Sequence, residues 1–176
     1  MVDFLAQDGL TGTAVLEVGG GVGEIGVELL RRGAASVTNL ELSSAYDVEA
    51  RALAEEAGVV DRVRRRIVDV AATPEDVEPA DLVVLHRVVC CYPDHERLLG
   101  AVADLCRGRL AFSHPPRNVA SRGGVATLNA LLALGRKEFR TFAHPPQAMV
   151  AVVAGRGLRP ALVHGGRFWQ VEGFSR

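Results

Sequence analysis

The sequence lacks the features that mark exported, membrane-spanning and nucleic-acid-binding proteins. Its only cysteines are Cys90, Cys91 and Cys106, an odd number. The N-terminus lacks the basic-then-apolar layout of a signal peptide, so we expect reduced thiols and a cytoplasmic location. No apolar run approaches the ~20 residues that cross a bilayer. The formal net charge of −1 gives no sign of a surface that would attract nucleic acid or an acidic membrane.

The composition that remains is typical of a globular protein. Hydrophobic residues make up 48% and charged residues 23% of the 176 residues, which is enough chain to bury a core. The sequence shows no internal repeat, linker or low-complexity tract. We therefore expect one domain that spans residues 1–176.

Strand-like and helix-like segments alternate along most of the chain, and the last segments read as a hairpin joined through Gly165 and Gly166. This alternation predicts an α/β fold, in which a doubly wound, mostly parallel sheet carries helices on both faces and ends in a C-terminal antiparallel hairpin. The expected strands cover residues 13–18, 36–42, 63–70, 81–86 and 109–113, and the expected helices cover 24–32, 45–57, 94–107, 125–134 and 146–154.

A glycine cluster follows the first expected strand, where residues 17–23 read E-V-G-G-G-V-G. Glycine accepts positive φ and lets a ligand lie against the bare backbone. The segment that begins at Gly21 also satisfies the pattern GxGxxG, through Gly23 and Gly26, which is typical of dinucleotide-binding folds. Glycine spacing alone therefore leaves two ligands open, S-adenosylmethionine (SAM) and NAD(P).

Acidic residues around the loop favour SAM. An acid within a strand, as at Glu17, is costly to bury unless it orders the loop or meets a cation such as the SAM ammonium group. Glu24 in the first helical turn would crowd a pyrophosphate. Glu41 and Asp69 end the next two strands, where they offer acceptors for a ribose diol and an adenine amino group.

With this pattern the chain resembles the class I SAM-dependent methyltransferases, from about Thr13 to its end. The resemblance implies a Rossmann-like, seven-stranded fold and SAM as cofactor. The segment 85–89 matches the region where that family often carries Asp or Asn, whereas this chain has His86. By resemblance the cofactor-binding residues are Glu17, Gly19, Gly20, Gly21, Gly23, Glu41, Leu42, Asp69, Val70 and His86.

Three residues near the expected carboxyl edge of the sheet are candidates for catalysis, namely His86, Tyr92 and His114. Each could act as a base or orient the substrate, although His86 is equally able to hydrogen-bond a backbone group. Methyl transfer from a sulfonium depends chiefly on holding the nucleophile in line with the methyl group. A general base is needed only when the nucleophile must lose a proton.

A metal centre and a phosphate site are both disfavoured. His86, Cys90, Cys91 and His95 offer zinc-ligand chemistry, but adjacent cysteines are expected to point apart and no separated CxxC pairs occur. The basic run at Arg62, Arg64, Arg65 and Arg66 is expected to be a solvated strand edge.

We therefore predict a methyltransferase whose acceptor is a small or medium organic molecule. Only about a dozen residues precede the first strand, so we expect a shallow pocket that is closed by residues 123–142 or by a second copy in a homodimer. Two alternatives stay open, an NAD(P)-dependent oxidoreductase and a SAM-binding or partner-binding protein without catalysis.

Overall fold

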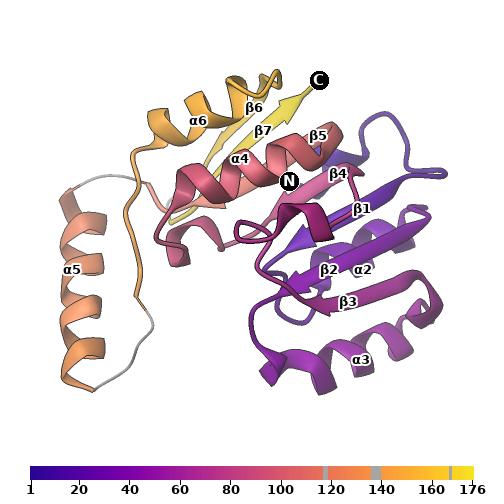
Figure 1. The fold of residues 1–176 in the computed structure, drawn as a ribbon, viewed down its shortest axis with the longest axis horizontal. Coiled ribbons are helices and arrows are strands. Elements are labelled where there is room, and N and C mark those ends of the chain that lie inside the picture. The colour runs from indigo at the N-terminus through magenta and orange to yellow at the C-terminus, as the bar shows by residue number, and fades with distance from the viewer. Residues whose placement is uncertain (117–118, 136–139, 167) are drawn as a thin grey trace.

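Seven strands form one mixed sheet in a computed structural model of the chain, which describes residues 1–116, 119–135, 140–166 and 168–176 (Figure 1). The strand order is β3-β2-β1-β4-β5-β7-β6. Neighbouring strands are parallel from β3 to β5, whereas β7 runs antiparallel to both β5 and β6. The predicted fold class is confirmed. The strands are β1 Ala14–Val18, β2 Ser36–Glu41, β3 Val63–Ile67, β4 Ala80–Leu85, β5 Cys106–His114, β6 Arg159–Gly165 and β7 Gln170–Ser175.

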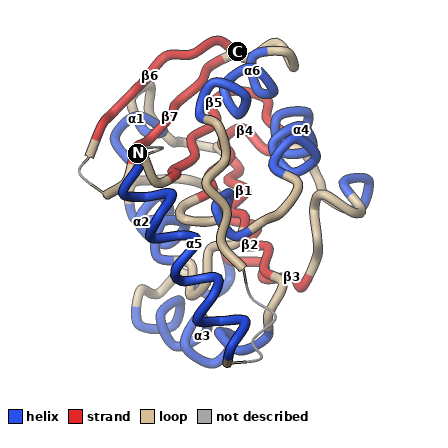
Figure 2. The backbone as a smooth tube through the Cα atoms, turned by 90° about the vertical axis from the view of Figure 1, so that its left-hand side faces the viewer, coloured by secondary structure: helices blue, strands red, loops and turns tan. Residues whose placement is uncertain are grey.

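Helices cover both faces of the sheet. On one face lie α1 (Val2–Ala6), α2 (Glu24–Arg31) and α3 (Asp47–Glu56), and on the other lie α4 (His95–Leu105) and α6 (Pro146–Ala154) (Figure 2). Helix α5 (Val119–Leu134) extends away from the rest of the molecule, on the side where the parallel strands end (Figures 1 and 2). Short 3-10 helices complete the described elements, at η1 Ser44–Tyr46, η2 Val60–Arg62, η3 Pro74–Asp76 and η4 Val89–Cys91. Among the described residues, no helix is long and apolar enough to span a membrane.

Successive side chains of β1 point to opposite faces of the sheet. Leu16 and Val18 belong to the core under α4 and α6, whereas Val15 belongs to the core under α1, α2 and α3. Because side chains alternate along a strand, Glu17 shares the face of Val15. Glu17 therefore points towards the α2 and α3 side, away from the face that Val18 shares with α4.

The structure differs from the sequence prediction near Cys106. The helix predicted for residues 94–107 ends at Leu105, and Cys106 begins β5. Gly108 lies within β5 and is not a helix stop. A side chain is excluded there, because a Cβ would lie 2.8 Å from the carbonyl oxygen of Asp81 on β4. The pairing of β4 with β5 shifts register at this point, which is the position where a strand glycine is expected. Helix α1 was not predicted.

Candidate functional site

A cleft of about 380 Å³ opens where β1, β2 and β3 end and the segment after β4 begins. In an open α/β sheet, ligands bind in the crevice beyond the carboxyl ends of the strands. The cleft has backbone, acidic, basic and aromatic groups on its walls. Its lining residues are Val18, Gly19, Gly21, Leu40, Glu41, Leu42, Ser43, Tyr46, Val68, Asp69, Val70, Arg87, Val88, Cys91, Tyr92 and Leu98.

The glycine loop between β1 and α2 requires its glycines. Gly19 and Gly21 have φ of +62° and +56°, in the region that side chains rarely adopt. A Cβ at Gly19 would lie 2.6 Å from a methyl carbon of Val88, and one at Gly20 would lie 2.5 Å from the carboxyl carbon of Glu17. A Cβ at Gly21 would meet nothing within 4 Å. At Gly20 the loop therefore packs closely against the side chain of Glu17. At Gly21, which lines the cleft, no other described residue covers the side of the backbone where a Cβ would stand.

Glu41 lines the cleft beside this loop. One carboxylate oxygen accepts a hydrogen bond from the amide of Gly21 at 3.0 Å, and the other accepts from the amide of Leu42 at 2.8 Å. Each carboxylate oxygen retains acceptor capacity, because a carboxylate offers about four lone-pair sites. Glu41 is therefore oriented by the backbone and can still accept hydrogen bonds from a ligand.

Asp69 and Tyr92 meet at the opposite wall of the cleft. The Tyr92 hydroxyl lies 3.0 and 3.1 Å from the two carboxylate oxygens of Asp69, and Asp69 also accepts from the amide of Ala71 at 3.0 Å. Burial and the hydrogen bond to Asp69 raise the pKa of Tyr92, so its hydroxyl is a donor rather than a base. This contact joins the end of the β3 segment to the segment after β4.

Behind the glycine loop, a polar ladder crosses three parallel strands. Glu17, Asn39 and Arg65 are register partners on β1, β2 and β3. The amide of Asn39 donates to a carboxylate oxygen of Glu17 at 3.1 Å, and the Arg65 guanidinium donates to the Asn39 side-chain oxygen at 2.7 Å. The same guanidinium donates to the carbonyl of Gly21 at 2.6 Å. The ladder therefore ties the back of the loop to the sheet.

Glu17 lies on this ladder and does not line the cleft. Its carboxylate is buried and accepts a further hydrogen bond from the amide of Gly26 at 3.2 Å. Burial raises the pKa of Glu17 to about 7, against the opposing effect of its hydrogen-bond donors. Of the two roles considered for Glu17, ordering the loop is the one that its hydrogen bonds with Gly26 and Asn39 support.

The basic run on β3 is not uniformly solvated, which corrects the sequence-based expectation. β3 is the edge strand and Arg64 is exposed, as expected, but Arg65 is largely buried and anchored on four groups. Besides its contacts with Asn39 and Gly21, its Nε pairs with Asp47 at 2.7 Å and its Nη2 donates to Ser43. No feature of the sequence distinguishes the arginine that turns towards the loop from the others in the run.

Replacing Arg65 should loosen the glycine loop. We expect Arg65→Ala to destabilise the fold by about 1–3 kcal/mol, the scale for losing hydrogen bonds to a charged group. Arg65→Lys should recover little, because one ammonium cannot reproduce the planar fork that spans Gly21, Asn39 and Asp47. Urea unfolding measures this change. The matched control is Arg64→Ala, on the exposed face of the same strand, and equal effects of the two alanine variants would contradict the role of the ladder.

His86 immediately precedes the cleft residue Arg87 but does not itself line the cleft. Its Nδ1 is 3.0 Å from the Ser113 hydroxyl, which also accepts from the amide of Arg87 at 2.9 Å. Burial, followed by the charge of Arg87, lowers the pKa of His86. Arg87 itself lines the cleft, has a φ of +61° and places its guanidinium 5.1 Å from the ring centre of Trp169. A strained non-glycine residue at a strand end is a frequent sign of a functional position.

His114 is buried on the face of β5 that also carries Phe112, and it is not among the residues that line the cleft. Its Nδ1 lies 2.9 Å from the carbonyl of Pro115, and its Nε2 lies 3.6 Å from a carboxylate oxygen of Glu172 on β7. Alternation along β5 puts His114 on the face of Phe112, and the sequence pattern alone could not tell which face of the sheet this is. A catalytic role for His114 therefore has no geometric support.

The structure brings seven of the predicted site residues to the cleft wall and separates five from it. The five that do not line the cleft are Glu17, Gly20, Gly23, His86 and His114. Nine further residues line the cleft without having been predicted, and Tyr46, Arg87 and Cys91 are among them. Arg117, Asn118 and part of the expected closing segment at 123–142 lie outside the described residues. The seven that line the cleft are Gly19, Gly21, Glu41, Leu42, Asp69, Val70 and Tyr92.

Within the described ranges, no group of three or more histidine, cysteine or acidic residues could hold a metal ion. The two adjacent cysteines, however, do not have the divergent side chains that were expected. The Sγ atoms of Cys90 and Cys91 do not point apart but lie 3.6 Å from each other. Both thiols are directed at the carbonyl of Arg87, which accepts from them at 3.8 and 3.7 Å.

Comparisons with known proteins agree with this geometry. A family profile described as a methyltransferase domain matches residues 15–108. Magnesium protoporphyrin IX methyltransferase from Synechocystis PCC 6803, solved with bound S-adenosylhomocysteine (SAH), has a TM-score of 0.78 and 22% identity over 99% of this chain and 80% of that chain. An O-methyltransferase family protein from Burkholderia thailandensis has a TM-score of 0.78 and 19% identity over 100% of this chain and 55% of that chain.

A third similar structure is geranyl diphosphate C-methyltransferase from Streptomyces coelicolor, with a TM-score of 0.74 and 16% identity over 99% of this chain and 76% of that chain. No curated protein sequence matches the chain. The matched profile nevertheless covers more than half of the 176 residues and includes β1 to β4 with the glycine loop. The chain belongs to the class I SAM-dependent methyltransferase family.

Proposed function

We propose that the chain transfers the methyl group of SAM to a small or medium organic molecule, and that the cleft between Gly21 and Tyr92 holds the cofactor. The observation that carries the proposal is the pairing of a bare Gly21 backbone with carboxylates at Glu41 and Asp69 on one cleft. A ribose diol needs an acceptor and an adenine amino group needs another. These two acceptors therefore fit the adenosine part of SAM.

Different residues of the cleft would bind different parts of the cofactor. Glu41 would accept hydrogen bonds from the ribose hydroxyls, and Asp69, held by Tyr92, would accept from the adenine amino group. Bound SAM supplies an electrophilic methyl group on a sulfonium. What the chain then has to provide is alignment of the acceptor, because positioning alone supplies much of the rate in such a displacement.

A small organic acceptor is supported by the apolar and aromatic character of the cleft mouth. Leu42 and Tyr46 line the cleft and are 60% and 46% exposed, so they offer unoccupied apolar surface. Two of the similar proteins are named for acting on magnesium protoporphyrin IX and geranyl diphosphate, which are also non-polymeric substrates. We propose no nucleic-acid substrate, since the net charge is −1.

Calorimetry with SAM, SAH, NAD and NADP tests the cofactor. We expect SAM and SAH to bind and the two nicotinamide cofactors not to bind. Binding of NAD or NADP without SAM would favour the oxidoreductase alternative. Binding of SAM without methyl transfer to any member of a broad acceptor panel would favour a non-catalytic SAM-binding protein.

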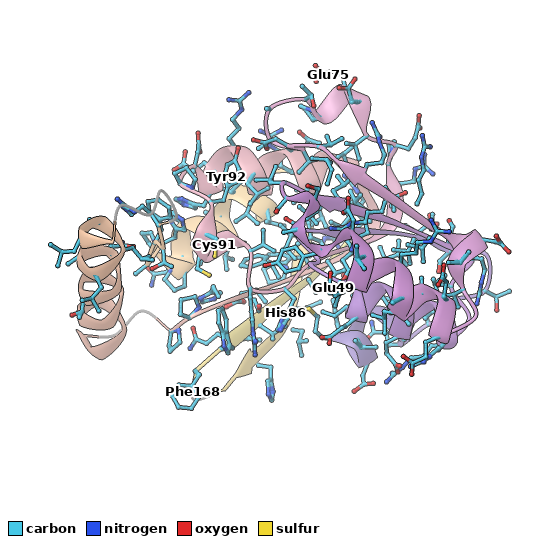
Figure 3. The ribbon with its side chains drawn as sticks, turned by 90° about the horizontal axis from the view of Figure 1, so that it is seen from below. Glu49, Glu75, His86, Cys91, Tyr92 and Phe168 are labelled. Atoms are coloured by element: carbon cyan, nitrogen blue, oxygen red, sulfur yellow. The ribbon has the colours of Figure 1, made fainter. Side chains whose placement is uncertain are left out.

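Glu41→Ala should weaken SAH binding. Removing a charged acceptor costs about 1–3 kcal/mol, which corresponds to about a 5- to 150-fold higher Kd for SAH. The control is Glu49→Ala, which removes the same charge from an exposed position on α3 and should leave the Kd nearly unchanged (Figure 3). Equal losses in the two variants would assign the effect to long-range charge and contradict a contact at Glu41.

We also propose a cytoplasmic location, supported by the three free cysteines at Cys90, Cys91 and Cys106.

A homodimer is proposed on the grounds that Leu131 and Leu134 of α5 are 61% and 82% exposed. Buried apolar surface at a subunit contact would cover them. Light scattering of the chain in solution measures its mass and tests this assembly.

A further inference from the structure

Two adjacent thiols stand at the wall of the cleft in contact with each other. Cys90 and Cys91 end the 3-10 helix η4, and their Sγ atoms are 3.6 Å apart. Cys91 lines the cleft together with Asp69 and Tyr92, whereas Cys90 is buried behind it. Figure 3 shows Cys91 and Tyr92 on the side of the molecule from which α5 extends. None of the roles assigned above uses either thiol.

The two thiols have different chemical characters. The hydrogen bond from Cys90 lowers the pKa of Cys91, and the same contact followed by burial raises the pKa of Cys90. A thiolate is the reactive form of cysteine, and a neighbouring thiol is what resolves its oxidised product. Cys91 is therefore the nucleophile of the pair and Cys90 its resolving partner.

We propose that Cys90 and Cys91 form a modification site for peroxides, at which oxidation to a disulfide between the two residues weakens cofactor binding in the cleft. In the first step, the Cys91 sulfur attacks one peroxide oxygen and the O–O bond breaks. Cys91 becomes a sulfenic acid, and the leaving hydroxide takes a proton to become water. In the second step, the Cys90 sulfur attacks the Cys91 sulfur, the S–O bond breaks, and the proton of Cys90 leaves with the hydroxide as a second water. Two thiols lose two electrons and the peroxide gains them.

The proximity of the pair permits this step, and the backbone makes it reversible. Adjacent Cα atoms lie about 3.8 Å apart, below the roughly 4.4–6.8 Å of ordinary disulfides. A bond formed under such strain is easily reduced by thiols. The site is therefore a reversible one rather than a permanent cross-link.

Disulfide formation would change the shape of the cleft by moving residues of η4 and the adjoining Tyr92. The Sγ atoms of both residues lie within hydrogen-bond distance of the carbonyl oxygen of Arg87, at 3.8 and 3.7 Å, and oxidation removes the thiol protons that can make this contact. The carbonyl of Cys90 also accepts from the amide of Phe142 at 2.7 Å, so η4 is held on both sides. Drawing the sulfurs together must displace Cys91 or its neighbour Tyr92, which holds Asp69. The effect on cofactor binding rests on the proposed function, whereas formation of the disulfide does not.

The experiment compares the reduced chain with the chain treated with hydrogen peroxide and then alkylated. Peptide mass spectrometry should show the segment with Cys90 and Cys91 lighter by two hydrogen atoms and unalkylated, and restored by dithiothreitol. Cys106 is the internal control, because burial raises its pKa to about 11 and it should stay a thiol that is alkylated only after unfolding. Alkylation of both Cys90 and Cys91 after peroxide, or a disulfide between two chains, would overturn the site.

Calorimetry of the same samples tests the coupling. The oxidised chain should bind SAH at least about tenfold more weakly than the reduced chain, with recovery on reduction. Cys90→Ser should form no disulfide, because the Cys91 sulfenic acid has no resolving thiol, and in excess peroxide it should pass to a sulfinic acid that dithiothreitol does not reduce. Cys91→Ser should be insensitive to peroxide. An unchanged Kd in a chain that carries the disulfide would overturn the coupling. A reduced chain that does not bind SAH would contradict the proposed function and the coupling with it, while the mass measurement still decides the site.

Discussion

Gly21→Asp is expected to abolish SAH binding. A Cβ at Gly21 meets no atom within 4 Å, so the aspartate side chain would be accommodated by the protein and would enter the cleft. There it would occupy the space proposed for the cofactor and place a second carboxylate beside Glu41, whose oxygen already accepts from the Gly21 amide. Calorimetry should show no measurable heat of SAH binding.

A control for the backbone strain is needed, because Gly21 has a φ of +56°. Gly58, at the end of α3, has a φ of +65°, and a Cβ there also meets nothing within 4 Å. Gly58→Asp should therefore cost similar stability and leave the Kd for SAH unchanged. If Gly21→Asp binds SAH as Gly58→Asp does, the cofactor does not lie against this loop.

The architecture and the two acidic residues that face the cleft could both be predicted from the sequence. Strand–helix alternation predicted the parallel sheet, and the acids at the ends of two successive strands were found because such ends converge at one edge. Glu41 and Asp69 line the same cleft as a result. These inferences need only local pattern and the geometry of parallel strands.

What the sequence could not supply is the direction of single side chains. Alternation places Glu17 on the opposite face from Val18, but which face carries the cleft depends on the register of β1 with its neighbours. Arg65 turns towards the loop because it pairs with Asn39 across two strands, a contact that joins positions 26 residues apart. His114 is buried beside Phe112 and Glu172 for the same kind of reason. Tertiary register, rather than composition, decides each case.

Because Glu17 is buried, the free energy of unfolding is expected to depend on pH. Burial raises its pKa from the ordinary 4.5 to about 7. Below about pH 4.5 the carboxyl is protonated in both the folded and the unfolded chain, so it contributes its full stability there. As the pH rises from 4.5 towards 7, the unfolded chain ionises first and the folded state loses stability relative to it. Above pH 7 the loss is complete, on the order of 3 kcal/mol, since each pKa unit is worth about 1.4 kcal/mol.

Glu17→Gln should remove this dependence, because an amide does not ionise and its oxygen can still accept from Gly26 and Asn39. Urea unfolding at pH 5 and pH 8.5 should show the variant gaining about 2–3 kcal/mol on the parent chain between these two values. Glu56→Gln, at an exposed position in α3, reports what a carboxyl-to-amide change does by itself. A difference between Glu17→Gln and the parent that stays constant with pH would mean that Glu17 is ionised in the fold, and the polar ladder would then be an ion pair network that reaches from Arg65 to β1.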